Sequence, residues 1–464
     1  MKPHPDARLV VAVSGQTLTG PELRSAVDDV ADKLAALPPG VLLAAMPVTL
    51  GAVLRYLGAL RAGRAIALID PGRPPDPLVT CFRPAAVLGA DPLVNPPAGY
   101  AMADLAGPAW TRRDPEGVTP HRDLAVLLPT SGSTGSPRFV RLSRAAVNAN
   151  ATAIAGVLGI GHDDVAPTSL PLHYSYGMSV LNSHLLAGAT VVIEDSGLLS
   201  RSFWQAVTDY RITSLAGVPH HYRMLRRLRF DPAEHPTLRT LTQAGGALPI
   251  DLVAQFHDAM ASVDGRLFVM YGQTEAAPRM STLPVHLLPA KLGSVGCPLP
   301  GGRFTVRHPD GAETDRPGVA GEVVYAGPNV MLGYAVSEAD LARGDDCDGV
   351  LATGDLGHLD ADGCLWLTGR LARIGKVFGH RVSLDDLEQL VRSAGLGMDA
   401  VGAVPAGDRV TLFVEGADQR ATTAAARALA DRLRMHVSGF DVRGIESLPL
   451  LSSGKIDYRA LEAQ

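Results

Sequence analysis

The sequence predicts an α/β protein, with a large N-terminal domain of helix-covered, mostly parallel sheets, a small β subdomain, and a small α+β C-terminal domain. Three observations predict this class. Over residues 41–272, short apolar runs alternate with stretches of helical periodicity, as in the strand–helix units of parallel sheets. Near residue 300 the chain changes to strand-like segments between Gly/Pro-rich turns. Residues 371–464 return to a mixture of helical and strand-like patterns.

Apolar runs are the predicted strands of the large domain. They span 41–46, 65–70, 124–129, 190–195, 214–218, 238–243 and 267–272, and the amphipathic stretches between them include predicted helices at 48–63 and 249–260. Strands are also predicted at 302–308 and 321–327, in a β subdomain of about residues 300–365. In the final domain we expect helices at 383–395 and 422–435 and strands at 400–406 and 409–415. These elements place the domains at 1–370 and 371–464.

The composition, with 46% hydrophobic and 19% charged residues, is that of an ordinary globular protein. A net charge of −5 argues against a nucleic-acid partner. No apolar run approaches the length of a membrane span, about 18 residues, and the N-terminus lacks a secretory pattern, so we expect a cytoplasmic protein. The cysteines have no CxxC spacing and are predicted to be reduced thiols rather than a zinc site or a disulfide framework. They are Cys81, Cys297, Cys347 and Cys364.

The run PTSGSTGSPR at 129–138 directly follows the predicted strand 124–129. Gly132 and Gly135 let the backbone approach a bound anion, the hydroxyl and amide groups can donate to phosphate oxygens, and Arg138 adds a positive charge. A Gly/Ser-rich linker is the alternative. However, a buried strand immediately upstream places the run at the edge where open α/β sheets bind ligands. The run therefore predicts a phosphate-binding loop, without the GK[ST] ending of a Walker motif.

Lysine is rare in this chain. Of the 42 Lys and Arg residues only five are lysines, namely Lys2, Lys33, Lys291, Lys376 and Lys455. A lysine retained amid this preference for arginine is a candidate for chemistry that needs a compact point charge, with chance survival as the alternative. Lys376 in GKVFGHR (375–381) and Lys455 in LSSGKIDY (451–458) are the two candidates.

Three further motifs have the composition of a nucleotide site. QAGGALP (243–249) offers a flat backbone surface for a ring. In YGQTEAA (271–277), Tyr271 can stack on a base, Thr274 can bond a phosphate, and Glu275 can hold Mg²⁺, although taken alone it reads as a surface acid. In 353–370, Asp355 can accept the hydroxyls of a ribose, and Arg370 closes the segment.

In this order, the motifs resemble those of the ANL superfamily of adenylate-forming enzymes, which includes acyl-CoA synthetases, firefly-luciferase-like enzymes and peptide-synthetase adenylation domains. TSGSTGSP resembles the phosphate loop, YGQTE the adenine and magnesium motif, TGDLG the ribose motif, GR…GHR the hinge region, and SSGKID the final lysine motif. The resemblance covers essentially the whole chain. It implies that a carboxylic acid attacks the α-phosphate of ATP, releases pyrophosphate, and forms an acyl-adenylate from which a nucleophile displaces AMP.

The resemblance also implies roles for single residues. Lys455 bridges the substrate carboxylate and the α-phosphate, Thr274 contacts the α-phosphate, and Glu275 binds Mg²⁺. A mobile C-terminal domain then rotates and brings in Lys376 for the second step, and Arg370 of the hinge region is the fifth catalytic residue. The implied ATP-binding set is Thr130, Ser131, Gly132, Ser133, Thr134, Gly135, Arg138, Gly245, Gly246, Ala247, Tyr271, Gly272, Gln273, Asp355 and Arg370.

Two positions depart from the family pattern. Arg138 stands where the family usually has lysine, and Ala372 replaces the common acid of the hinge. A rotation of the C-terminal domain therefore cannot pivot on that carboxylate.

The segment 170–189 resembles the part of the family that lines the acyl pocket. Tyr174 falls where acyl-CoA synthetases often carry histidine, and no aspartate is present to hold an α-amino group, which predicts an acid other than an amino acid. The expected pocket residues are His173, Tyr174, Ser175, Tyr176, Gly177, Ala216, Gly217, Ala276 and Ala277. Core packing is the alternative for His173, Tyr174 and Tyr176.

The acceptor of the acyl group is left open by the sequence. A thiol, either of coenzyme A or of the phosphopantetheine on a separate acyl carrier protein, is the leading interpretation. The alternatives are an amine, activation of a small oxyanion such as nitrite, and a non-catalytic nucleotide-binding protein. Arg223, Arg226 and Arg227 share a face of one predicted helix, which predicts either a docking face for an acidic carrier protein or a solvated basic face.

Overall fold

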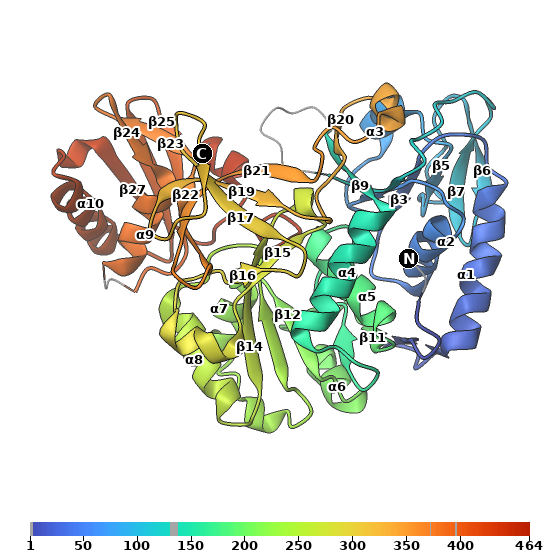
Figure 1. Cartoon of the computed structure of the whole chain (residues 1–464), viewed down its shortest axis with the longest axis horizontal. Coiled ribbons are helices and arrows are strands. Elements are labelled where there is room, and N and C mark those ends of the chain that lie inside the picture. Colours follow the sequence, from blue (N-terminus) through green and yellow to red (C-terminus); the bar gives the residue numbers. More distant parts are fainter. Residues whose placement is uncertain (1–2, 130–137, 372, 395–396) are drawn as a thin grey trace.

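The computed structural model describes residues 3–129, 138–371, 373–394 and 397–464. Figure 1 shows helices packed on sheets in the N-terminal part of the chain, a mostly antiparallel sheet in the middle of the view, and a further helix–sheet unit formed by the C-terminal residues at the left. This mixed architecture confirms the predicted fold class.

An eight-stranded sheet forms the core of the N-terminal part. In spatial order its strands are β20 (Gly333–Ala335), β9 (Phe139–Ser143), β8 (Leu124–Pro129), β4 (Ile66–Ile69), β3 (Leu42–Ala45), β5 (Ala86–Leu88), β7 (Pro108–Arg112) and β6 (Tyr100–Asp104). The central pairs β8–β4, β4–β3 and β3–β5 are parallel, and the outer pairs are antiparallel. Every residue of β4 is buried, as expected for a parallel strand covered on both faces. The accompanying helices are α1 (Gly20–Ala35), α2 (Leu50–Arg61), α3 (Asp76–Phe82) and α4 (Arg144–Leu158).

Two smaller sheets lie beside this core. One contains β12 (Ser214–Gly217), β13 (Thr240–Gln243), β14 (Arg266–Gly272), β15 (Arg279–Thr282) and β16 (Cys297–Pro298); the other contains β10 (Val165–Pro167), β11 (Thr190–Ile193), β1 (Arg8–Val11) and β2 (Thr17–Leu18). Their helices are α5 (Ser175–Leu186), α6 (Arg201–Asp209), α7 (Pro219–Arg227) and α8 (Ile250–Ala261). β12, β13 and β14 are parallel, so their carboxyl ends lie at one edge.

The remaining strands form antiparallel and C-terminal sheets. The antiparallel sheet contains, in spatial order, β18 (Glu313–Thr314), β17 (Arg303–Arg307), β19 (Ala320–Ala326), β21 (Val350–Leu359) and β22 (Leu365–Arg370). The C-terminal unit contains a hairpin of β23 (Ile374–Val377) and β24 (His380–Ser383), a sheet of β25 (Val401–Ala406), β26 (Arg409–Glu415) and β27 (Phe440–Ile445), and helices α9 (Leu384–Ser393), α10 (Gln419–Leu433) and α11 (Tyr458–Glu462). The division into domains at residue 370 stays a prediction.

The structure corrects the expectation for two of the cysteines. Cys297 and Cys364 form a disulfide, with Cα atoms 4.2 Å apart, whereas Cys81 and Cys347 are free thiols. The reason is a backbone pairing between distant segments: the amide of Leu365 donates to the carbonyl of Gly296 at 2.9 Å, which brings the neighbouring cysteines together. The absence of CxxC spacing tests only local pairs, so it could not detect a pair 67 residues apart.

Candidate active site

The predicted motifs gather at the carboxyl ends of parallel strands. β13 and β14 lead into residues 243–249 and 271–277, and β12 ends beside them at Gly217. β8 leads from the neighbouring sheet into the predicted phosphate loop, but Thr130, Ser131, Gly132, Ser133, Thr134 and Gly135 lie outside the described residues. The structure therefore describes the groups at these strand ends but not the loop itself.

Asp355 is the most heavily bonded carboxylate of the site. It is 2% exposed and lies opposite Arg370 in the β21–β22 register, where the Arg370 Nε donates to its Oδ1 at 2.6 Å. Gln273 donates through Nε2 to Asp355 Oδ2 at 2.7 Å, and the hydroxyl of Tyr271 donates to the same oxygen. Burial, reinforced by the adjacent Asp355 carboxylate, raises the pKa of Tyr271 well above its usual value, so its hydroxyl stays protonated as a donor. The predicted ribose and base residues thus form one connected group.

Glu275 lies on a short 3₁₀ helix, η2 (Thr274–Ala276), directly after β14. Its Oε1 accepts a hydrogen bond from the Tyr334 hydroxyl at 2.9 Å. The guanidinium of Arg138 lies 4.1 Å above the Tyr334 ring, so this tyrosine connects the predicted phosphate-loop cation with the predicted metal carboxylate. Thr274 lies beside the acyl-pocket segment, with its Oγ1 3.2 Å from Ser175 Oγ.

Lys455 reaches the site from a tight turn near the C-terminus. The amide of Leu451 donates to the Lys455 carbonyl at 2.8 Å and closes the turn. The Lys455 Nζ lies 5.4 Å from the centre of the Tyr174 ring, and the residue is exposed to solvent. Desolvation by the enclosing walls lowers the pKa of Lys455 and the charge of Arg370 lowers it further, whereas Glu275 and Asp355 oppose these effects. Lys455 is therefore a cation placed among the predicted nucleotide-binding groups.

A close backbone approach lets this turn enter the site. A Cβ atom on Gly454 would lie 2.7 Å from Val218 Cγ2, and its φ of +75° is a conformation that favours glycine. On the same side, His173 Nε2 lies 3.2 Å from Ser452 Oγ and 3.8 Å from Asp70 Oδ2. Burial lowers the pKa of His173, which favours its neutral form at this junction.

Lys376 lies apart from this group. It is exposed on β23, in the hairpin of the C-terminal unit. Within the described ranges, no hydrogen bond or ion pair joins Lys376 to the other predicted catalytic residues. The structure thus brings together Lys455, Glu275, Thr274 and Arg370 and leaves Lys376 outside.

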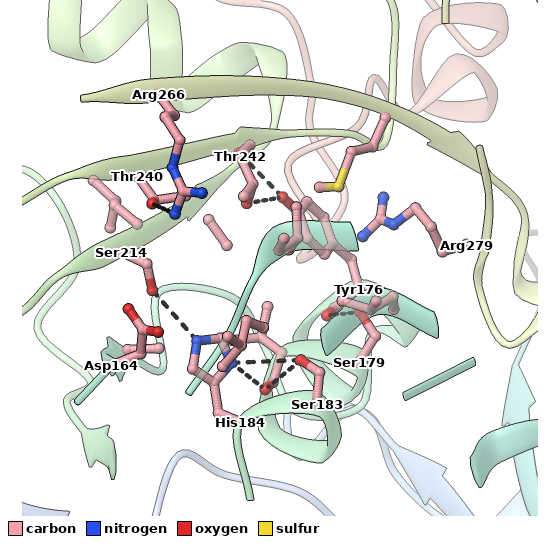
Figure 2. Close-up of a pocket in the computed structure, with 18 residues that line it drawn as sticks. Asp164, Tyr176, Ser179, Ser183, His184, Ser214, Thr240, Thr242, Arg266 and Arg279 are labelled. Carbon is pink, nitrogen blue, oxygen red and sulfur yellow. Dashed lines mark hydrogen bonds between the residues drawn. The ribbon is translucent and has the colours of Figure 1, made fainter. Parts of the chain in front are cut away.

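A cavity lies behind the site, between α4, α5 and the β12–β14 sheet (Figure 2). Two of the predicted pocket residues, Tyr176 and Ala216, line it. Tyr176 is also fixed by hydrogen bonds from its hydroxyl to the carbonyl and hydroxyl oxygens of Thr242, at 3.0 and 2.7 Å, so the wall and core-packing interpretations of this residue are compatible. Figure 2 shows Arg279 near Tyr176 on one side and Asp164, Ser214 and His184 on the other.

The other predicted pocket residues do not line this cavity. Ser175 and Gly177 lie in the first turn of α5, and a Cβ on Gly177 would lie 2.2 Å from the Pro171 carbonyl oxygen. Tyr174 is packed over Gly245, where a Cβ would meet its hydroxyl at 2.5 Å. Ala276 and Ala277 are buried, Gly217 ends β12, Gly246 and Ala247 are exposed, and Gly272 ends β14.

Several residues that line the cavity were not predicted from the sequence. Ser179 and Ser183 follow Tyr176 along α5 at helical spacing, a signal that could have found them. Arg279, Arg266 and Met270 line the cavity from β14 and β15 and belong to no recognisable motif. His184 is buried, and because its Nδ1 lies 2.8 Å from the Val180 carbonyl oxygen, that nitrogen carries the proton.

The predicted arginine face of α7 is not a free surface. Arg226 pairs with Asp399, and Arg227 pairs with Glu415 at 3.0 Å, both on the C-terminal unit. The interpretation as a purely solvated face is therefore incomplete for these two arginines, because each pairs with an acidic residue distant in sequence, although the Arg227 side chain is still 71% exposed. A docking face for a carrier protein stays a prediction.

Most of the chain matches a known protein family. The model of the family described as AMP-binding enzyme matches residues 1–335. The chain is 31% identical to indoleacetate–CoA ligase of Aromatoleum aromaticum over 64% of this chain and 57% of that protein, and thus spans less than two thirds of that relative. It is 31% identical to feruloyl-CoA synthase of an Amycolatopsis species, over 80% of this chain and 74% of that protein. It is 29% identical to L-proline–[L-prolyl-carrier protein] ligase of Streptomyces coelicolor, over 87% and 84%.

Solved structures share the fold. The o-succinylbenzoate CoA synthetase of Bacillus subtilis, in complex with its acyl-adenylate, aligns with a TM-score of 0.77 at 22% identity, covering 98% of this chain and 94% of that one. Every helix of the described ranges is too short or too polar to traverse a bilayer. With a family match over most of its length and the family's motifs gathered at one edge of its parallel strands, this chain belongs to the AMP-binding enzymes, a family of adenylate-forming ligases.

Proposed function

We propose that the protein is an ATP-dependent acid–AMP ligase that adenylates a carboxylic acid other than an amino acid and passes the acyl group to a thiol. The observation that carries the proposal is the position of Lys455. A lysine from the C-terminal unit, whose side chain is exposed, lies within electrostatic range of Glu275, Asp355 and Arg370 at the strand ends, where the predicted phosphate loop begins. Such a cation is suited to a transition state that gathers negative charge between a carboxylate and a phosphate.

The residues present fit Mg²⁺ bound together with ATP. Glu275 offers one carboxylate beside the phosphate-loop cation Arg138, and the described residues contain no group of three or more side chains that could hold a metal by themselves. Mg²⁺ favours this arrangement, because it is commonly held by one or two carboxylates and substrate phosphates. When bound, it would neutralise phosphate charge. Asp355 would orient the ribose, and Thr274 would donate to the α-phosphate.

A thiol acceptor is supported by the relatives, which include CoA ligases and a carrier-protein ligase. Their named acids are aromatic in some and proline in another, so they select no acid for this chain. Either coenzyme A or a carrier-bound phosphopantetheine fits the proposal, as does a site of action in the cytoplasm. Lys376 is proposed to act after a rotation of the C-terminal unit, because it is exposed in the present arrangement.

The test is ATP–pyrophosphate exchange with Mg²⁺ and a panel of aliphatic, aromatic and amino acids and nitrite. We expect exchange with one class of carboxylic acid and a loss on the order of a hundredfold in Lys455→Ala, because that substitution removes a cation aimed at the transition state. Lys33→Ala is the matched control, since Lys33 is an exposed lysine in the last turn of α1. ATP binding without exchange for any acid would contradict the proposal and favour a non-catalytic protein. Mass spectrometry of products formed with coenzyme A, a carrier protein or an amine then identifies the acceptor.

A further inference from the structure

Arg279 places a positive charge in the wall of the cavity. It opens β15 and is 2% exposed. Figure 2 shows its guanidinium directed toward the Tyr176 ring, and the distance from Cζ to the ring centre is 4.5 Å. A buried arginine stays charged, because its ordinary pKa lies far above neutrality even when burial lowers it.

This charge has no counter-ion in the described part of the chain. Among the residues that the structure describes, no ion pair joins Arg279 to a carboxylate, its Nε is buried without a hydrogen-bond partner, and the Tyr176 side chain is the group that interacts with its guanidinium. Its close contact is the Tyr176 ring, and attraction to an aromatic face offsets only part of the cost of desolvating a guanidinium. An uncompensated charge beside a cavity indicates that an anion entering the cavity would be bound there.

Other buried arginines of this protein donate hydrogen bonds through their guanidinium groups to nearby oxygen atoms. Arg141 pairs with Asp346 and also donates to main-chain carbonyls, including that of Leu332 at 2.8 Å. Arg55 donates to the Ala106 carbonyl at 3.0 Å, and Arg112 donates to several carbonyls. The Nε atoms of Arg55, Arg141 and Arg279 are all buried without a partner, but the terminal nitrogens of Arg55 and Arg141 donate to oxygen acceptors, whereas the Arg279 guanidinium faces the Tyr176 side chain.

The Arg279 backbone is held in place independently of its side chain. The side-chain amides of Asn150 and Asn329 both donate to the Arg279 carbonyl at 2.8 Å, and both asparagines are buried. The guanidinium is consequently presented to the cavity by a rigid strand start, as a binding group should be.

Two tyrosines connect Arg279 with Lys455. The Lys455 Nζ lies 5.4 Å from the centre of the Tyr174 ring, that ring lies 6.3 Å from the Tyr176 ring, and the Arg279 Cζ lies 4.5 Å from the centre of the Tyr176 ring. Two neighbouring aromatic rings thus each have a cation beside them. Of these groups, Tyr176 and Arg279 line the cavity. A molecule that extends from Lys455 past Tyr174 into the cavity would place one anionic group at Lys455 and another at Arg279.

We propose that the substrate is a dicarboxylic acid, whose first carboxylate is adenylated beside Lys455 while its second carboxylate pairs with Arg279. The proposal rests on the proposed adenylation for the first carboxylate. The pairing itself is a binding contact that a guanidinium makes well, through parallel hydrogen bonds to both carboxylate oxygens. Arg279 is then a specificity-determining residue rather than a catalytic one.

The test compares matched acids that differ only in the second carboxylate and are long enough to pass the two rings: adipate with hexanoate, suberate with octanoate, and terephthalate with benzoate. Binding is measured by calorimetry in the presence of Mg²⁺ and a non-hydrolysable ATP analogue, and ATP–pyrophosphate exchange is measured in parallel. We expect at least one dicarboxylate to bind more tightly than its partner. Arg279→Met should weaken that dicarboxylate on the order of a hundredfold, because one partner of a buried charged pair is lost, and should leave the monocarboxylate and the KM for ATP unchanged. Arg279→Lys should recover part of the loss, because it restores the charge without the planar fork.

The outcomes separate the two proposals. Dicarboxylate preference in binding without any exchange would retain the role of Arg279 and contradict the adenylation. Exchange with monocarboxylates at least as good as with every dicarboxylate would overturn the role of Arg279 and retain the adenylation. Equal losses for both members of a pair in Arg279→Met, at unchanged melting temperature, would also overturn it, because they would show that the arginine supports Tyr176 rather than a second carboxylate.

Discussion

Tyr334 illustrates how single residues complete a site that motifs only outline. Its hydroxyl bonds Glu275 and its ring lies under Arg138, yet it stands in the chain more than fifty residues beyond YGQTE. Arg279 is similar, since its importance follows from burial without a counter-ion. The sequence predicted Lys455, Glu275, Asp355 and Arg370 as neighbours because they occur in recognisable motifs. It could not predict Tyr334 or Arg279, because their properties depend on which distant groups surround them.

Gly245 is expected to be intolerant of even a methyl group. In Gly245→Ala, the new Cβ would lie 2.5 Å from the Tyr174 hydroxyl at a φ of +85°. We expect Tyr174 to be displaced and the KM for the acid to rise at least about tenfold, with a smaller change for ATP. The control is Gly197→Ala, which has a similar φ of +75° and no neighbour within 4 Å. It should show only the backbone strain, about 1 kcal/mol of stability. Equal kinetics for the two variants would contradict this role of Gly245.

Because His221 is partly buried, we expect the protein to lose stability in acid. Burial, reinforced by the charge of His220, lowers the pKa of His221 from 6.5 to about 4. Between these two values the unfolded chain binds a proton that the folded chain does not, so stability is complete above pH 6.5 and falls as the pH falls toward 4. At pH 5 this protonation lowers the free energy of unfolding by about 2 kcal/mol relative to its value above pH 6.5. Chemical denaturation at pH 7.5 and 5.0 should show this difference reduced in His221→Gln and unchanged in His162→Gln, whose side chain is exposed.

At the scale of elements, the predicted strands of residues 41–272 were found because their apolar runs are continuous and buried. Several strands that the sequence did not predict are very short, although β21, which has ten residues, was also missed. β10 and β5 have three residues each, too few to show a periodicity. β20 also has three residues, and it leaves the predicted β subdomain to pair with β9 in the large sheet. Such a pairing depends on contacts between distant segments, which local patterns do not encode.

The attachment of β20 gives an element-scale prediction. Arg141 of β9 is fully buried and donates to the carbonyls of Leu332, Arg343 and Gly344 around β20. Arg141→Met should lower the free energy of unfolding by about 3 kcal/mol, because it removes these buried hydrogen bonds and one of the two arginines that pair with Asp346. It should also raise the Mg²⁺ concentration needed for half-maximal exchange, since β20 carries Tyr334 to Glu275. Tyr334→Phe is the matched variant: it should reproduce the Mg²⁺ effect without the loss of stability. A normal Mg²⁺ requirement in both variants would contradict this connection.

At the scale of the whole molecule, ion pairs hold the C-terminal unit against α7. Arg226→Glu should reverse the pairing with Asp399 and reduce exchange several-fold, because Lys455 enters the site on the same unit. Asp399→Arg in the same chain should restore activity, and the effect of Arg226→Glu should shrink at high salt. Arg229→Glu, which makes the same charge change beyond the end of α7 where no ion pair is found among the described residues, should leave exchange unchanged. Failure of the double variant to recover activity would contradict the role of this pair.

The arrangement of the units was only partly accessible from the sequence. The composition change near residue 300 and the patterns after residue 371 predicted the order of the sheets along the chain. They could not predict that Asp399 and Glu415 would pair with Arg226 and Arg227, because complementary charges on separate units leave no local pattern. Rotation of the C-terminal unit stays a prediction, and Ala372 lies outside the described residues.

Under the proposed function, the turn that carries Lys455 would couple nucleotide binding to the position of the C-terminal unit. If that unit moves away, the ammonium group leaves a site that still contains Glu275 and Asp355, and the local charge falls by one. An anion held there is then bound less tightly. By thermodynamic reciprocity, the factor by which the inserted lysine strengthens ATP binding is the factor by which ATP favours insertion. Release of pyrophosphate would weaken the preference for the inserted lysine. The C-terminal unit could then move away and expose the acyl-adenylate to the acceptor.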